Sequence, residues 1–186
     1  MVHVEVKRIV IRQVMFFKTT VGEVAADRAD SVTPLIMQTA IGQGNTLVSP
    51  MHMALITCAI ANDGVLMKPY FIDEVVNDNG DSVKKTEPVA YKRLMSSNEA
   101  NLLGKLMKQV VDSGTASALS GRSYTVAGKT GSAEFDEEGH SHSWFIGYSN
   151  VDDPDLVVAV IVENGGSGSE AAVPIAGQIF DAYHAS

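Results

Sequence analysis

The sequence is short of the features that mark several large classes of protein. A single cysteine, Cys58, rules out a disulfide within the chain, and its place on the apolar side of a predicted helix indicates a buried structural thiol. No run of eighteen apolar residues occurs, and residues 1–8 lack the apolar core of a signal peptide. The 14 lysines and arginines are outnumbered by 22 aspartates and glutamates. This acidic balance argues against general binding of nucleic acid or of an anionic membrane.

What the sequence does contain is typical of a globular protein. Its 186 residues are 45% hydrophobic and 19% charged, enough for one domain with a sizeable core. Residues 2–17 alternate at first between valine and polar side chains, which predicts a strand, and residues 18–34 are polar, as in a surface connection. We therefore divide the chain into a strand-like arm with its connection, 1–34, and a main portion, 35–186.

Local signals predict an antiparallel sheet covered by helices, an α/β fold in the broad sense (α+β). Helix start signals at Ser49-Pro50 and Ser96, together with apolar residues at helical spacing, predict helices over 50–62, 97–112 and 172–184. Runs of β-branched and aromatic residues predict sheet strands near 124–135, 142–149 and 156–162. A turn at Asn79-Gly80 predicts a small hairpin from Tyr70–Val76 into the residues after Ser82. Residues 165–170, rich in glycine, are expected to form a flexible loop.

The run from Tyr124 to Phe135 gathers the residues with the most chemistry. In a strand, Lys129 and Gly131 would lie on one face and Thr130 and Ser132 on the other. Glycines within a strand allow another backbone or a ligand to approach closely. An anionic ligand along such an edge would meet an ammonium, hydroxyl donors and free backbone N–H groups.

The motif Lys129-Thr130-Gly131, in this context, resembles the end of a penicillin-binding-protein transpeptidase domain, of the serine β-lactamase and D,D-peptidase superfamily. The resemblance covers about residues 35–184 and rests on several segments in family order: Ala40–Gly44, Val48–Pro50, Ala59–Gly64, Ala127–Glu134, His142–Tyr148 and Leu156–Val162. It implies a β-lactamase/transpeptidase-like fold that is incomplete at its N-terminal side.

The family's nucleophile is not where the resemblance would place it. In the family, Ser-x-x-Lys and then Ser-x-Asn precede the Gly-Gln-Gly segment, and neither occurs before Gly42. Ser82-Val-Lys-Lys85 lies next to the predicted hairpin turn, and Ser96-Ser-Asn98 opens the predicted capping box, so both have a simpler local explanation. We therefore expect that the chain carries the Lys-Thr-Gly strand but lacks the nucleophile and is inactive by itself.

The resemblance also implies roles for five residues. Lys129 would set a positive potential, Thr130 would hydrogen-bond a substrate carboxylate, and Gly131 would complete the substrate-binding strand. Ser132 would supply a backbone N–H to the oxyanion hole, and Gln43 would line the cleft. The implied ligand is a peptidoglycan stem peptide or a β-lactam, and no cofactor is expected. His140 and His142 share a strand face without a third ligand at motif spacing, so no metal site is predicted either.

The function predicted from these observations is that of part of a penicillin-binding peptidoglycan D,D-transpeptidase, an acyl transferase that cross-links the cell wall. Its full-length parent would be extracytoplasmic, and the missing N-terminal part of the domain is a possible partner. Two alternatives stay open: a non-catalytic binding or scaffold fragment, favoured by the lack of a nucleophile, and a β-lactamase or β-lactam sensor domain.

Overall fold

A computed structural model describes residues 37, 43, 47–135 and 138–185. Its centre is an antiparallel sheet in the order β5–β6–β7, built from β5 (Val126–Glu134), β6 (Ser141–Ser149) and β7 (Val157–Val162). The three predicted sheet strands are thus confirmed, with their bounds shifted by one or two residues. The predicted strand over 2–17, the connection after it and the main portion's first residues lie outside the described residues, apart from Met37 and Gln43.

In the described part of the chain, three long helices flank this sheet, and their bounds follow the predicted signals closely. They are α2 (Pro50–Ala61), α3 (Ser97–Ser113) and α4 (Ala172–His184), and a short 3₁₀ turn, η1 (Ser117–Leu119), follows α3. The hydroxyl of Ser49 accepts the His52 N–H at the start of α2. Ser96 and Glu99 form the capping box of α3, each accepting a hydrogen bond from the backbone of the other.

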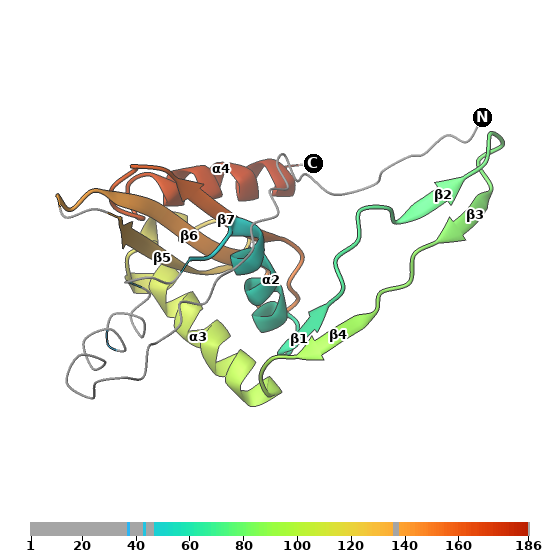
Figure 1. Ribbon diagram of the computed structural model, residues 1–186, viewed down its shortest axis with the longest axis horizontal. Coiled ribbons are helices and arrows are strands. Elements are labelled where there is room, and N and C mark those ends of the chain that lie inside the picture. The colour runs from blue at the N-terminus through green and yellow to red at the C-terminus, as the bar shows by residue number, and fades with distance from the viewer. Residues whose placement is uncertain (1–36, 38–42, 44–46, 136–137, 186) are drawn as a thin grey trace, which may run out of the picture.

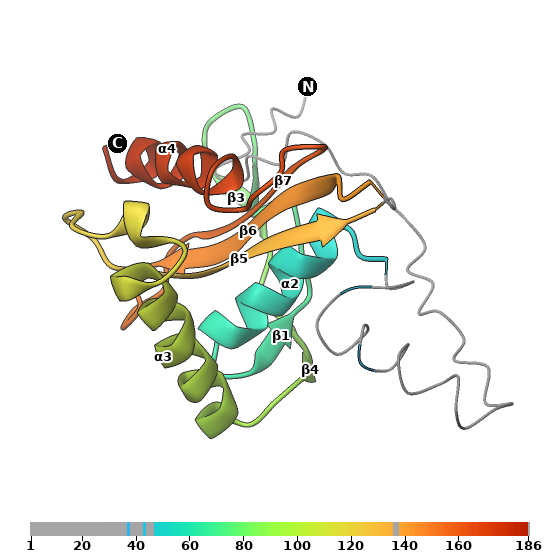
Figure 2. The ribbon, with the colours of Figure 1, turned by 90° about the vertical axis from the view of Figure 1, so that its left-hand side faces the viewer.

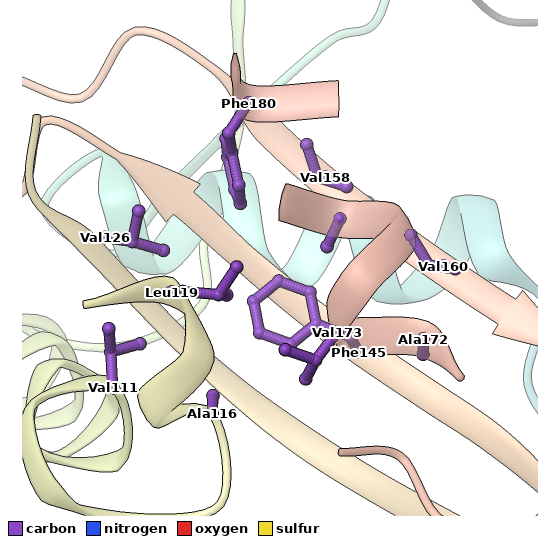
Figure 3. Packing of buried hydrophobic residues seen from close by; sticks show 11 residues of the cluster. Val111, Ala116, Leu119, Val126, Phe145, Val158, Val160, Ala172, Val173 and Phe180 are labelled. Carbon is purple, nitrogen blue, oxygen red and sulfur yellow. The ribbon is translucent and has the colours of Figure 1, made fainter. Parts of the chain in front are cut away.

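The sheet is covered on both faces (Figures 1 and 2). Helix α4 lies on one face, while α2 and α3 lie on the other, and Cys58 of α2 is half-buried, where burial raises the pKa of its thiol. The larger core cluster joins α4, η1 and the sheet around Phe145 and Phe180, whose rings meet edge to face at 6.4 Å (Figure 3). A smaller cluster of Met107, Ala127 and Tyr148 fills the space beneath α2 and α3.

Two glycines make room for the central aromatic ring. A Cβ at Gly128 would lie 2.4 Å from Cζ of Phe145, and one at Gly147 would lie 2.7 Å from the same atom. The two glycines are register partners across β5 and β6, and the ring of Phe145 packs against both. Any side chain at either position would therefore force the ring or the strands apart.

The segment between α2 and α3 forms a ribbon that extends away from the sheet (Figure 1). Near the core, β1 (Val65–Met67) pairs with β4 (Ala90–Arg93), and further out β2 (Glu74–Val76) pairs with β3 (Ser82–Lys85). The predicted hairpin is confirmed, but its first strand is shorter than predicted, since residues 70–73 lie outside the ladder. The pairing of β1 with β4 was not predicted.

A polar cluster fastens α4 to the entry of β5. The guanidinium of Arg122 donates to both carboxylate oxygens of Asp181, and the Tyr124 hydroxyl donates to one of them. The ring of Tyr124 also stacks on His184 at 3.9 Å. Burial, followed by the hydrogen bond to Asp181, raises the pKa of Tyr124 to about 12, while the bonds from Arg122 and Tyr124 lower the pKa of Asp181.

This raised pKa predicts a loss of stability in alkali. The folded state holds the Tyr124 proton more tightly than the unfolded state, whose tyrosines titrate near pH 10. The stabilisation of the folded state by protonated Tyr124 is therefore complete below about pH 10 and is lost as the pH rises through about 12. We expect Tyr124→Phe to flatten the pH dependence of the free energy of unfolding between these values, measured by urea denaturation. Tyr91→Phe, at an exposed position, is the control, and equal slopes for wild type and Tyr124→Phe would contradict the prediction.

Candidate functional site

The open edge of β5 is the most distinctive feature of the sheet. Among the described residues, β5 pairs only with β6. Thr125 and Phe135, at its two ends, bond across to the next strand, so alternation directs the peptide groups of Gly128, Thr130 and Ser132 away from β6. Three N–H groups and three carbonyls thus line an edge that has no strand partner in the described part of the chain.

Two side chains already bond to this edge. The amide of Gln43 donates to the carbonyl oxygen of Ser132 at 3.1 Å, and Nζ of Lys129 donates to the carbonyl oxygen of Thr130 at 2.7 Å. Both acceptors are carbonyls that point away from β6. The structure therefore brings the five residues named from the sequence, including Gly131, together along one edge.

The side chains of the motif divide between the two faces of the sheet. Lys129 is the register partner of Ile146, on the face toward α2 and α3, and Gly131 shares that face. Thr130 pairs with Phe145 on the α4 face, where Ser132 also lies. Lys129 and Ser132 are exposed, and Thr130 is half-buried. A ligand at this edge would therefore find the ammonium and the hydroxyls on opposite sides of the strand.

Thr115 supports the motif in a way that sequence reasoning missed. Its hydroxyl oxygen lies 2.6 Å from that of Thr130, a hydrogen bond in which either group can donate. The residue follows the end of α3, where the Ala116 N–H returns to the Val110 carbonyl. The sequence did not predict this contact, because it joins residues 15 positions apart.

The glycine-rich loop after β7 is packed against the motif, in contrast to the flexible loop that was expected. Gly168 is buried, and a Cβ there would lie 2.7 Å from the carbonyl oxygens of both Gly131 and Trp144. Its N–H faces the Ser132 hydroxyl at 3.4 Å, and the Ser143 hydroxyl donates to the Ser167 carbonyl at 2.9 Å. The glycine therefore serves close packing, which composition alone did not distinguish from flexibility.

Lys129 dominates the local electrostatics. It is the only lysine or arginine in residues 123–186, whereas residues 130–186 contain ten aspartates and glutamates. An anionic group that binds at the β5 edge would gain charge compensation from this ammonium.

The histidines and serines set aside in the sequence have local partners. Nδ1 of His142 accepts the Asn164 N–H at 3.1 Å, and no group of three His, Cys, Asp or Glu in the described part of the chain could hold a metal ion. Ser82 lies on the exposed strand β3, and the Ser96 hydroxyl is engaged with Glu99 in the α3 cap.

Comparison with known proteins gives consistent matches. Residues 14–181 match the sequence model of the family described as penicillin binding protein transpeptidase domain. Peptidoglycan D,D-transpeptidase PbpA of Mycolicibacterium smegmatis is 32% identical over 164 residues, covering 79% of this chain and 33% of that protein. Stage V sporulation protein D of Bacillus subtilis is 35% identical over 152 residues, covering 76% of this chain and 23% of that protein.

Comparison with solved structures agrees with these sequence matches. The structure of penicillin-binding protein A from M. tuberculosis, a ceftriaxone acyl-enzyme complex, matches with a TM-score of 0.76 and 28% identity, over 89% of this chain and 38% of that chain. The chain spans about a quarter to a third of the length of the curated relatives it matches.

The packing of Gly168 yields a test of the site's architecture. We expect Gly168→Ala to destabilise the protein by about 1–3 kcal/mol, because the added methyl group overlaps backbone atoms of Gly131 and Trp144. Urea denaturation would measure this loss, and hydrogen exchange would show faster exchange at Gly131. Ser169→Ala, in the same loop, should have a much smaller effect. A Gly168→Ala protein as stable as wild type would contradict this close packing.

Proposed function

This chain belongs to the penicillin-binding-protein transpeptidase family, and we propose that it forms the C-terminal portion of a peptidoglycan D,D-transpeptidase domain that binds its acyl donor along the open edge of β5. The observation that carries the proposal is the cluster formed by Lys129, Thr130 and Ser132 on a strand edge whose peptide groups lack a strand partner among the described residues. The division of the chain at residue 34 is part of the same proposal.

The ligand is an extended peptide or peptide mimic that ends in a carboxylate. Its backbone would pair with the outward-facing N–H and C=O groups of β5 as an added strand, replacing the present bonds of Gln43 and Lys129 to two of the carbonyls. Its carboxylate would receive a hydrogen bond from the Thr130 hydroxyl. The Lys129 ammonium would reach around the edge from the opposite face and exchange its present bond to the Thr130 carbonyl for a stronger one between two charged groups. A stem peptide ending in D-Ala-D-Ala and a β-lactam both satisfy this description.

The same edge supplies an electrostatic element of acyl transfer. The Ser132 N–H points away from β6, where it can donate to the oxygen that becomes negative as the carbonyl is attacked. One such donor typically stabilises a transition state by about 3–4 kcal/mol. The Gly168 loop packed behind Gly131 supports this role, because it limits movement of the strand that carries the donor.

The nucleophile in this proposal comes from a segment outside these 186 residues. Ser82 lies on the exposed strand β3 and Ser96 caps α3, so both belong to other elements than β5. Both also follow the Gly-Gln-Gly segment, whereas the family's serine motif precedes it. A serine on the N-terminal part of the domain would attack the bound carbonyl and form an acyl-enzyme, which divides the transfer into two easier steps. The chain alone therefore binds without turnover, and its full-length parent works outside the cytoplasm.

The outer edge of β7 is the surface proposed for that N-terminal part. The Ser149 N–H bonds to the Leu156 carbonyl, so alternation directs the peptide groups of Val157, Ala159 and Ile161 away from β6. In the described ranges, no strand pairs with them. Helices cover both faces of β7, as is usual for a strand in the middle of a sheet. An apolar strand with an unpaired edge favours addition of another strand.

The described helices include none long and apolar enough to span a membrane.

Intact-mass spectrometry tests the lack of a nucleophile. We expect the mass of the chain to be unchanged after incubation with a reactive penicillin, because Ser82 lies on an exposed strand and the Ser96 hydroxyl is held by Glu99 in the α3 cap. A single adduct would contradict this, and Ser82→Ala and Ser96→Ala variants would identify its site. Hydrolysis of the β-lactam would instead favour a β-lactamase or sensor domain.

Reversible binding tests the role of the β5 edge separately. In saturation-transfer NMR with a peptide ending in D-Ala-D-Ala, we expect Lys129→Ala to weaken binding about ten-fold or more, because a charge-assisted hydrogen bond to the carboxylate is lost. Lys92→Ala, on the exposed strand β4, is the matched control. Equal affinities for wild type and Lys129→Ala would remove Lys129 from the site.

A further inference from the structure

A second, polar pocket lies on the α2 and α3 side of the sheet and shares no residue with the β5 edge. Its volume is about 420 Å³, and its walls come from the end of α2, the first half of α3 and the turn between β6 and β7. The residues that matter for its chemistry are Asp63, Asn101, Gly104, Lys105, Tyr148, Asp152 and Asp153. The proposed transpeptidase role does not use this pocket.

Tyr148 gives the pocket a polar group that has no partner in the described ranges. Its side chain is 3% exposed and packs with Met107 and Ala127, so the ring belongs to the core. The hydroxyl oxygen packs against Gly104, where an added Cβ would lie 2.6 Å from it, and both residues line the pocket. No hydrogen bond joins this hydroxyl to any described residue, and burial raises the pKa of the phenol. A hydroxyl without a protein partner at the wall of a pocket can accept a hydrogen bond from a group that enters the pocket.

The rim of the pocket is acidic. Asp63, Asp152 and Asp153 contribute three carboxylates against the single ammonium of Lys105, a formal net charge of −2. None of these three carboxylates forms an ion pair or a side-chain hydrogen bond with another described residue. The loops that carry them are held in place, because Arg93 donates to the Asp63 carbonyl at 2.7 Å and the Asp153 N–H donates to the Asn150 carbonyl at 2.9 Å.

This arrangement favours an organic cation over a metal ion. The carboxylates are too dispersed to hold a metal, since no group of three acidic, histidine or cysteine side chains among residues 47–135 and 138–185 has the required geometry. A flat guanidinium needs paired acceptors in one plane, whereas an ammonium is a compact charge with three donors. One hydroxyl at the floor and separated carboxylates at the rim suit an ammonium at the end of an alkyl chain.

We propose that this pocket binds an alkylammonium group, which donates a hydrogen bond to the Tyr148 hydroxyl and is neutralised by Asp152, Asp153 and Asp63. The group is either one end of a free diamine or the side-chain amine of a lysine-like residue in a peptide. Asn101, whose amide has no hydrogen bond to another described residue, lies on the wall beside it.

Titration of the full chain with cadaverine tests the proposal. Binding would be followed by calorimetry and by the NMR signals of the Tyr148 ring, which should shift on addition of the diamine. We expect Tyr148→Phe, which removes only the hydroxyl oxygen, to weaken binding about ten-fold or more, the usual effect of losing a hydrogen bond to a charged group. The free energy of unfolding of this variant checks that the core is intact.

Charge variants give opposite expectations. Combined Asp152→Asn and Asp153→Asn should weaken binding, whereas Lys105→Met should tighten it several-fold, because a competing ammonium is removed. Glu87→Gln, an exposed acidic position outside the pocket, should leave the affinity unchanged. A titration that leaves the Tyr148 signals unmoved, or equal affinities for wild type and Tyr148→Phe, would overturn the proposal.

A second ligand separates the two sources of the ammonium. Nα-acetyl-lysine amide carries one amine on a peptide-like backbone, so binding as tight as that of cadaverine supports a lysine-like side chain of a peptide. Much weaker binding of this compound, with cadaverine binding retained, supports a free diamine. Failure of both ligands would reject the site while leaving the proposed role of the β5 edge untouched.

Discussion

The packing of Phe145 against two facing glycines is the constraint on which the rest of the structure depends. Gly128 and Gly147 are register partners, and the ring fills the space that their missing side chains leave. A shift of β5 by one residue would turn every side chain of the strand, including those of Val126 and Lys129, to the opposite face of the sheet. A side chain would then lie under the ring. The register fixed by this contact decides which peptide groups face the open edge, and therefore where Thr130 and Ser132 present their N–H and C=O groups.

The parts of the fold that were predicted correctly are those specified by local chemistry. The capping box at Ser96 and the start signal at Ser49-Pro50 fix helix ends through bonds within three or four residues. Strand β7 is recognisable from its unbroken apolar run, whose residues are all buried or partly buried. The pairing of β1 with β4 was missed because these strands are short and β4 is exposed, so neither shows a clear alternation.

The candidate site also has a part that could be predicted from local sequence and a part that could not. Lys129, Thr130, Gly131 and Ser132 are adjacent in the sequence, so a strand was enough to predict their relative faces. The contacts of Thr115 and Gly168 with this strand were not predictable, because each joins distant segments and depends on how α3 and the loop after β7 pack. A glycine-rich loop looks the same in sequence whether its glycines permit motion or permit close contact, and only the neighbouring backbone atoms distinguish the two.

The isolation of Lys129 among acidic residues has a consequence for how ligands arrive. Residues 122–186 carry ten carboxylates against Arg122 and Lys129, and Arg122 is already paired with Asp181, so beyond a few ångströms the field around this part of the chain repels anions. An anionic peptide would be slowed on approach and attracted only at contact. Because the Debye length shortens from about 30 Å at 0.01 M salt to about 10 Å at 0.1 M, added salt would weaken the distant repulsion more than the short-range attraction. Capture of an anionic ligand by this surface would then become faster in salt, the opposite of ordinary electrostatic steering.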